Sequence, residues 1–212
     1  MLRRALLAAA ASLVLAMHAA AGAAPVGPAG AVVRDECVAL PGYPEFRTKL
    51  RGIVAARDAT AFKALFHPAG AMRISGIGGP VSYPWNFDRP EASEVWAELE
   101  RILSLGCVRE GEKLVLPSTA ALAGDVEPGD LVVLQRVAIR TRPQARARVL
   151  RTARPGEVFT PLVYEPEGWV RIETRGRKGY LPLSVLRSPF DARLELVRFE
   201  GGWRIKSFGD GV

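Results

Sequence analysis

The chain has 212 residues, of which 49% are hydrophobic and 24% charged, and its formal net charge at pH 7 is +7. Beyond the N-terminus, no apolar run approaches the roughly 20 residues of a membrane-spanning helix, which excludes a multi-span membrane protein. The two cysteines and the one histidine that follows the N-terminal segment, His67, are too few for a convincing structural zinc site.

The N-terminus has the three parts of a secretion signal. Arg3 and Arg4 form a charged start, the apolar run 6–16 follows, and residues 21–23 (Ala-Gly-Ala) offer a small-x-small cleavage site. The run is too short and too rich in alanine to anchor the protein in a bilayer. We therefore predict that residues 1–23 are a signal peptide and that the mature protein is periplasmic or secreted, from a bacterium.

Cys37 and Cys107 form an even pair in a chain that is expected to reach an oxidising compartment, which makes them a disulfide candidate. The alternative is two buried thiols, because unpaired cysteine packs as a small hydrophobic residue. A bridge would tie the N-terminal segment 24–43, which begins with Pro, Gly and Ala and is expected to be mobile, to the end of a helix.

Residues 44–130 show helical and strand patterns and are expected to form a helical α+β region. Apolar residues recur at helical spacing after Pro44 and again after Pro90. Asp58 is a stop or cap between the first two helices, and Gly106 ends the third. The expected order is a helix from Pro44, a helix over 60–66, a break over 67–70, a strand over 71–75, a loop over 76–84, a helix from Pro90, a strand over 114–116 and a polar turn over 125–130.

Residues 131–188 contain short apolar alternations separated by turn signals at 142–143, 155–156, 167–168 and 176, a pattern typical of a small all-β barrel. The alternation predicts inward side chains at Ile139, Val149, Val158, Val163, Val170, Ile172 and Leu181.

Residues 189–212 are expected to form a closing β-hairpin. Strands around Leu194 and Trp203 flank a turn at 200–202. A lone hairpin is marginal in water, so this one is expected to pack on the α+β region, with the barrel inserted before it. The predicted fold class is therefore α+β.

The motifs within residues 131–188 resemble those of the bacterial SH3 (SH3b) family. The matching stretches are 138–143 (AIRTRP, with Arg142 where the family has Gly), 168–172 (GWVRI), 176–181 (GRKGYL) and 184–186 (SVL). The resemblance implies a non-catalytic binding module of the kind found on secreted and cell-wall proteins.

The whole arrangement resembles bacterial exported proteins in which a helical α+β region is followed by SH3b and a closing hairpin, and this resemblance implies architecture alone. The matching stretches are 55–58, 61–66, 95–99, 105–106, 202–205 and 209–210. A helix pair followed by a Trp-containing last strand is also similar to NTF2-like domains.

The positive charge gathers in the barrel segment. Residues 132–188 hold 12 Lys and Arg against 4 Asp and Glu. Such a field attracts anionic partners. Export removes nucleic acid as an ordinary partner, so the expected partner is an anionic cell-envelope polymer, phospholipid head groups, a peptide or an acidic envelope protein. The alternative is a solvated surface of single charges that has no ligand.

The resemblance singles out five candidate ligand-binding residues, which are Arg140, Trp169, Arg171, Lys178 and Tyr180. Trp169 can stack on a sugar or peptide, or serve only as barrel packing. The cationic residues can pair with the carboxylates of a peptidoglycan stem. Tyr180 is expected to pack in the barrel.

Catalytic combinations have little support. Asp58, His67 and Ser75 could be written as a triad and Cys107 with His67 as a thiol–imidazole pair, but no motif such as GxSxG accompanies them. We expect no enzyme and no cofactor. A second hypothesis places the ligand or partner site in the α+β region and leaves the barrel a packing role only.

Overall fold

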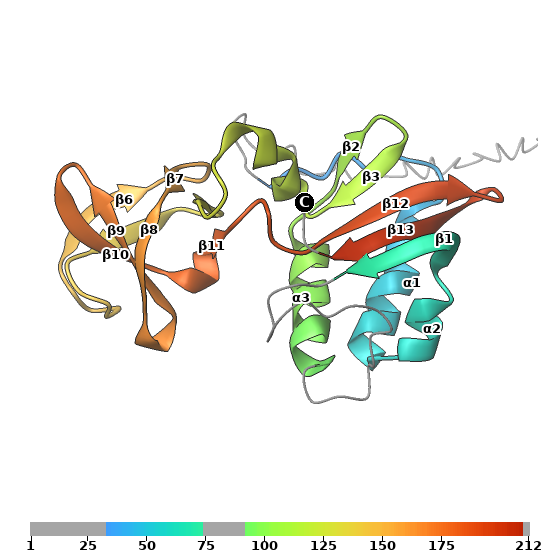
Figure 1. Ribbon diagram of the computed structural model, residues 1–212, viewed down its shortest axis with the longest axis horizontal. Helices are drawn as coiled ribbons and strands as arrows, with labels where there is room; N and C mark the ends of the chain where they lie inside the picture. Colours follow the sequence, from blue (N-terminus) through green and yellow to red (C-terminus); the bar gives the residue numbers. More distant parts are fainter. Residues whose placement is uncertain (1–32, 74–91, 210–212) are drawn as a thin grey trace, which may run out of the picture.

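The computed structural model describes residues 33–73 and 92–209. The expected signal peptide and the expected loop 76–84 lie outside these residues. The chain folds into two parts, which Figure 1 shows at opposite ends of the molecule. We call residues 33–130 and 189–209 the α+β region, and residues 131–188 the SH3-like segment. The predicted α+β class is confirmed.

Three helices form where the apolar periodicity predicts them: α1 (Tyr43–Ala56), α2 (Ala59–Lys63) and α3 (Ala92–Ser104). α1 buries Tyr43, Phe46, Leu50, Ile53 and Val54 along one face. Asp58 caps α2, since its carboxylate accepts a hydrogen bond from the Ala61 backbone N–H at 2.9 Å.

The expected break at 67–70 is wrong, because these residues belong to strand β1 (Phe66–Arg73). α2 therefore ends earlier than expected. Among the described strands, β1 pairs only with β13, in parallel, and lies at the edge of the sheet. An edge strand tolerates Pro68, whose missing N–H costs no sheet hydrogen bond on the outer side. The register is irregular between Phe66 and Ala71.

The sheet of the α+β region has the order β1-β13-β12-β3-β2. The closing hairpin, β12 (Arg193–Phe199) and β13 (Gly202–Gly209), lies at its centre, between β1 and β3. β3 (Lys113–Leu116) pairs with the short strand β2 (Val108–Glu110), which the apolar pattern did not predict. The hairpin that follows the SH3-like segment thus joins strands that precede this segment into one sheet.

The three helices cover one face of this sheet (Figure 1). One apolar cluster fills the space between them, with Leu50, Phe62 and Leu99 from the helices and Leu196 and Ile205 from the sheet. The opposite face is covered at β2 and β3 by the 3-10 helix η1 (Ser118–Asp125), whose Ala120 packs with Val108 and Val115.

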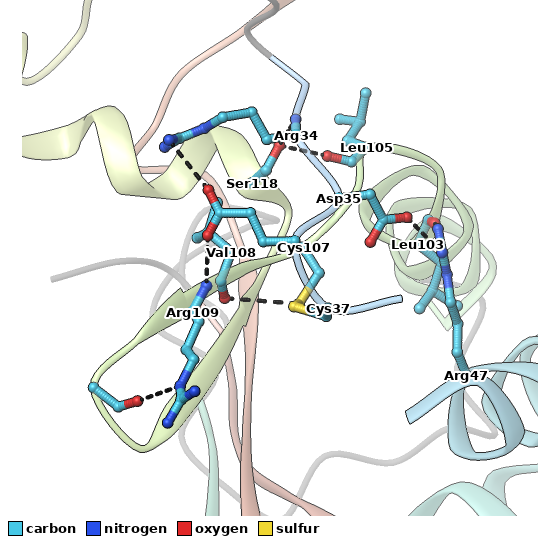
Figure 2. Close-up of a disulfide and its surroundings, with 12 residues drawn as sticks. Arg34, Asp35, Cys37, Arg47, Leu103, Leu105, Cys107, Val108, Arg109 and Ser118 are labelled. Atoms are coloured by element: carbon cyan, nitrogen blue, oxygen red, sulfur yellow. Dashed lines mark hydrogen bonds and ion pairs between the residues drawn. A yellow bond between two sulfur atoms is a disulfide. The ribbon is translucent and has the colours of Figure 1, made fainter. Parts of the chain in front are cut away.

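The N-terminal segment is fixed over its described part, from residue 33. The predicted disulfide joins Cys37 and Cys107, whose Cα atoms are 5.7 Å apart. Figure 2 shows the bridge beside a short parallel pairing of two backbones. The Glu36 N–H donates to the Cys107 carbonyl at 2.8 Å, and the Cys107 N–H donates to the Arg34 carbonyl at 2.9 Å. This segment is therefore held along its backbone as well as by the bridge.

The SH3-like segment forms two sheets around its own apolar cluster, rather than one closed ring of paired strands. The five-stranded sheet has the order β6-β5-β10-β9-β8, and the three-stranded sheet β11-β4-β7. The strands are β4 (Leu131–Val133), β5 (Val137–Arg140), β6 (Val149–Ala153), β7 (Val158–Phe159), β8 (Pro161–Glu165), β9 (Trp169–Thr174), β10 (Arg177–Pro182) and β11 (Leu186–Arg187).

Four of the seven predicted inward residues are fully buried: Ile139, Val170, Ile172 and Leu181. The prediction is wrong for Val149, Val158 and Val163, which are exposed. Val149 and Val163 each lie beside a register shift, where one extra residue reverses the alternation. In β7 the inward position belongs to Phe159.

The two parts meet at the end of β11. Arg187 is 1% exposed and donates to the Glu98 carboxylate of α3 at 2.6 Å and to the Ala192 carbonyl at 2.7 Å. Arg101 of α3 donates to the Leu186 carbonyl. The two apolar clusters are separate. The junction is thus built from polar contacts between α3 and β11.

Candidate binding site on the outer sheet face

Alternation along β9 and β10 divides their side chains between two faces of the five-stranded sheet. The inward positions are Val170, Ile172, Thr174, Gly179 and Leu181, all buried. The outward positions are Trp169, Arg171, Glu173, Lys178, Tyr180 and Pro182. We call the outward face the outer sheet face.

Strand register brings three of the candidate residues into one row. Tyr180 of β10 lies opposite Arg140 of β5 on one side and Arg171 of β9 on the other. Val163 of β8 lies opposite Arg171 and continues the row. Residues that face each other across strands have Cβ atoms about 4.5–5.5 Å apart. An aromatic ring thus stands between two guanidinium-bearing residues.

The other two candidates flank this row. Trp169 lies opposite Pro182 on β10 and two residues from Arg171 on the same strand. It is half-buried, as is Tyr180. Lys178 lies on the far side of Tyr180, is exposed and faces Glu173. The structure therefore brings all five candidates to one face.

Both arginines of the row are oriented by local contacts. Arg140 donates through Nη1 to the Ala147 carbonyl at 2.8 Å. Arg171 forms an ion pair with Glu165, with Nε 3.5 Å from Oε1. This Nε has no hydrogen-bond partner within the described part of the chain. A guanidinium carries five N–H donors, so each arginine keeps donors for a carboxylate or a carbonyl.

The structure also shows an apolar border that the alternation did not predict. Leu162, Val163 and Tyr164 are exposed on β8, which is an edge strand of the five-stranded sheet. The signal in the sequence is the uninterrupted run of apolar residues from Pro161 to Tyr164, where a half-buried strand would alternate. The row therefore ends in an apolar surface next to Arg171.

The residues considered for catalysis are engaged elsewhere. Asp58 caps α2, and Cys107 is in the disulfide. The His67 ring packs edge-on against the Phe199 ring, with 4.5 Å between the ring centroids, and the His67 Nδ1 accepts a hydrogen bond from the Ala69 N–H. Ser75 lies outside the described residues. Within residues 33–73 and 92–209, no three His, Cys, Asp or Glu residues gather in a way that could hold a metal ion.

The bounds of the folded segment and its sequence motifs agree with a family comparison. Bacterial SH3 domains match residues 134–187, which is the SH3-like segment apart from Leu131, Val132, Val133 and Ser188. The chain therefore carries a bacterial SH3 domain. The comparison with curated proteins gives no match. None of the helices in the described ranges is long and apolar enough to cross a membrane.

Proposed function

We propose that this protein is a non-catalytic component of the bacterial cell envelope that binds peptidoglycan or its peptides through the outer sheet face of its SH3 domain. The observation that carries the proposal is the row Arg140–Tyr180–Arg171 with Trp169 beside it. Aromatic faces suit sugar rings and peptide backbones, and guanidinium groups suit the carboxylates of stem peptides.

Other features support a location outside the cytoplasm. The N-terminal residues have the pattern of a signal peptide, and Cys37 and Cys107 are joined in a disulfide. The net positive charge of the SH3-like segment favours encounter with an anionic polymer. On this proposal the protein is exported and acts as a tether or an adaptor.

A second candidate function places the ligand in the α+β region and gives the SH3-like segment a packing role only. That arrangement would require broad apolar contact between the two parts. The junction is instead polar, centred on Arg187 and Glu98, and the apolar clusters are separate. These observations favour binding by the SH3-like segment.

The test is co-sedimentation of the purified protein with peptidoglycan sacculi over a range of salt concentrations. Retention should be strongest at low salt, because salt screens exposed charges. Trp169→Ala combined with Arg171→Gln should lower retention about tenfold or more, since a stacking aromatic and a charge-assisted hydrogen bond each contribute about 1 kcal/mol or more.

The control is Arg175→Asn combined with Arg177→Gln, which removes two exposed cations from the same segment, at and beside the turn between β9 and β10 and outside the row. This variant should be retained like the unmodified protein. Equal loss in both variants, or no sedimentation of the unmodified protein at low salt, would overturn the proposal.

A further inference from the structure

The positive charge of the SH3-like segment is concentrated in one hairpin, formed by β5 and β6. Residues 132–156 contain seven arginines and no acidic residue. The remainder of the segment, residues 157–188, holds five Lys and Arg against four Glu. The arginines of the hairpin are Arg136, Arg140, Arg142, Arg146, Arg148, Arg151 and Arg154.

Two of these arginines have partners inside the segment. Arg140 donates to the Ala147 carbonyl, and Arg151 pairs with Glu157 at 2.7 Å. The other five are exposed. None of the five forms an ion pair with a carboxylate of the described residues. Unpaired arginines at this density repel one another, and an anionic partner would relieve that repulsion.

Three of the exposed arginines gather at the tip of the hairpin, which we define as residues 141–149. They are Arg142, Arg146 and Arg148. The tip is an ordered turn. The Thr141 N–H donates to the Arg148 backbone carbonyl at 2.9 Å, and the Ala147 N–H donates to the Gln144 backbone carbonyl at 3.1 Å. The Arg140 side chain adds a third bond across it. The arginines are therefore presented from a fixed platform.

An apolar side chain stands among them. Val149 follows Arg148 directly and is 47% exposed, although it is the first residue of β6. The register shift beside it turns it outward. β6 is also an edge strand, at the end of the sheet opposite β8. The tip thus combines cations with an exposed apolar group, away from α1–α3 (Figure 1).

We infer that the hairpin tip docks on a membrane surface that contains anionic phospholipids. Arginine forks match phosphate oxygens, and the negative potential of such a surface attracts clustered cations. Val149 fits the boundary between headgroups and acyl chains, where an apolar side chain leaves water. A soluble polyanion would use the arginines but would gain nothing from Val149. The inference does not depend on the function proposed above.

The test measures partitioning of the purified protein onto vesicles of phosphatidylcholine alone and of phosphatidylcholine with an equal part of phosphatidylglycerol. Binding should require phosphatidylglycerol. Each cation near an anionic surface contributes about fivefold to the partition coefficient, so Arg142→Gln, Arg146→Gln and Arg148→Gln together should lower it about 100-fold.

The matched control removes three exposed cations away from the tip, with Lys49→Gln, Arg57→Asn and Arg136→Gln. Both triple variants then have the same net charge, and both keep the N-terminal residues unchanged. The partition coefficient of the control variant should fall by less than about tenfold, which is a tenth of the factor expected for the tip variant. Equal weakening in both variants would mean that only the net charge matters, and would overturn the inference.

Val149→Ser distinguishes binding to a lipid surface from binding to a soluble polyanion. It should weaken vesicle binding about threefold while leaving binding to soluble polyphosphate unchanged, since half of a valine side chain contributes roughly that much on leaving water. Vesicle binding that is the same with Val149→Ser as with the unmodified protein would contradict docking by this tip.

Discussion

Arg187 and Glu98 form the ion pair that joins the two parts of the molecule, with 2.6 Å between Nη2 and Oε1. The two residues differ sharply in exposure, because the Arg187 side chain is 1% exposed and the Glu98 side chain 27%. The other terminal nitrogen of the Arg187 guanidinium, Nη1, is buried and has no hydrogen-bond partner within the described residues. The buried charge of Arg187 therefore depends heavily on Glu98.

Glu98→Ala should destabilise the protein by about 2 kcal/mol. Removing one partner of a buried pair costs roughly 3–5 kcal/mol, and the partial exposure of Glu98 lets water offset some of that loss. The measurement is urea unfolding at neutral pH. Lys113→Ala is the control. The Lys113 ammonium pairs with the Glu195 carboxylate at 3.2 Å, and the Lys113 side chain is 51% exposed. It should cost less than about 1 kcal/mol. Equal costs would contradict the view that Arg187 depends on Glu98.

Loss of the disulfide should cost about 4 kcal/mol. The bridge links residues 70 apart in the sequence, and a loop of this length restricts the unfolded chain by about that free energy. The comparison is urea unfolding with and without reductant, in the unmodified protein and in Cys37→Ala/Cys107→Ala. Reductant should lower the midpoint of the first and leave the second unchanged. If complete reduction of the disulfide leaves the unfolding midpoint of the unmodified protein unchanged, the estimate is wrong.

Gly106→Ala should disrupt the contact between the N-terminal segment and Cys107. Gly106 has φ +73°, and an added Cβ would overlap the Arg34 carbonyl oxygen, which accepts the Cys107 N–H. We expect a loss of more than about 2 kcal/mol, from the unfavourable φ and the displaced backbone together. Gly111→Ala is the control. It has φ +62° and open space around it, so it should lose only about 1 kcal/mol. Similar losses at both positions would show that the close approach to Arg34 is unimportant.

The helices and the candidate site could largely be predicted, because both rest on local periodicity. Phe46 and Leu50 lie on one face of α1 since a helix repeats every 3.6 residues. Arg171 and Tyr180 share the outer sheet face since strand side chains alternate. That they are direct neighbours depends on the register of β9 and β10, which the short turn at 175–176 fixes.

The remaining features depend on irregular or distant contacts. Val149 and Val163 were misplaced because a bulge reverses alternation without leaving a mark in the apolar pattern. Pro68 indicated a break, whereas its place at a sheet edge makes it compatible with a strand. The pairing of Arg187 with Glu98 joins residues far apart in the chain, which no local pattern reports.

Stability should fall as pH rises above 10, through the ionisation of Tyr43. Burial raises the pKa of Tyr43 from 10.0 to about 12, because the phenolate is poorly solvated there; nearby Asp35 raises the pKa further, and Arg47 and Arg51 oppose the shift. The folded protein thus holds this proton more tightly than the unfolded chain. The resulting stability is complete below pH 10 and is lost as pH rises through about 12.

The expected loss from Tyr43 is about 2–3 kcal/mol at pH 12, at 1.36 kcal/mol per pKa unit. Tyr43→Phe removes the group that ionises, and the Tyr43 hydroxyl has no hydrogen-bond partner among the described residues, so the variant should fold normally. The measurement is the difference in unfolding free energy between the two proteins from pH 9 to pH 12. Titration of lysines and other tyrosines affects both alike and cancels in that difference. The free energy of unfolding of the unmodified protein should fall relative to that of the variant as pH rises. A constant difference between the two would show that folding does not raise the pKa of Tyr43.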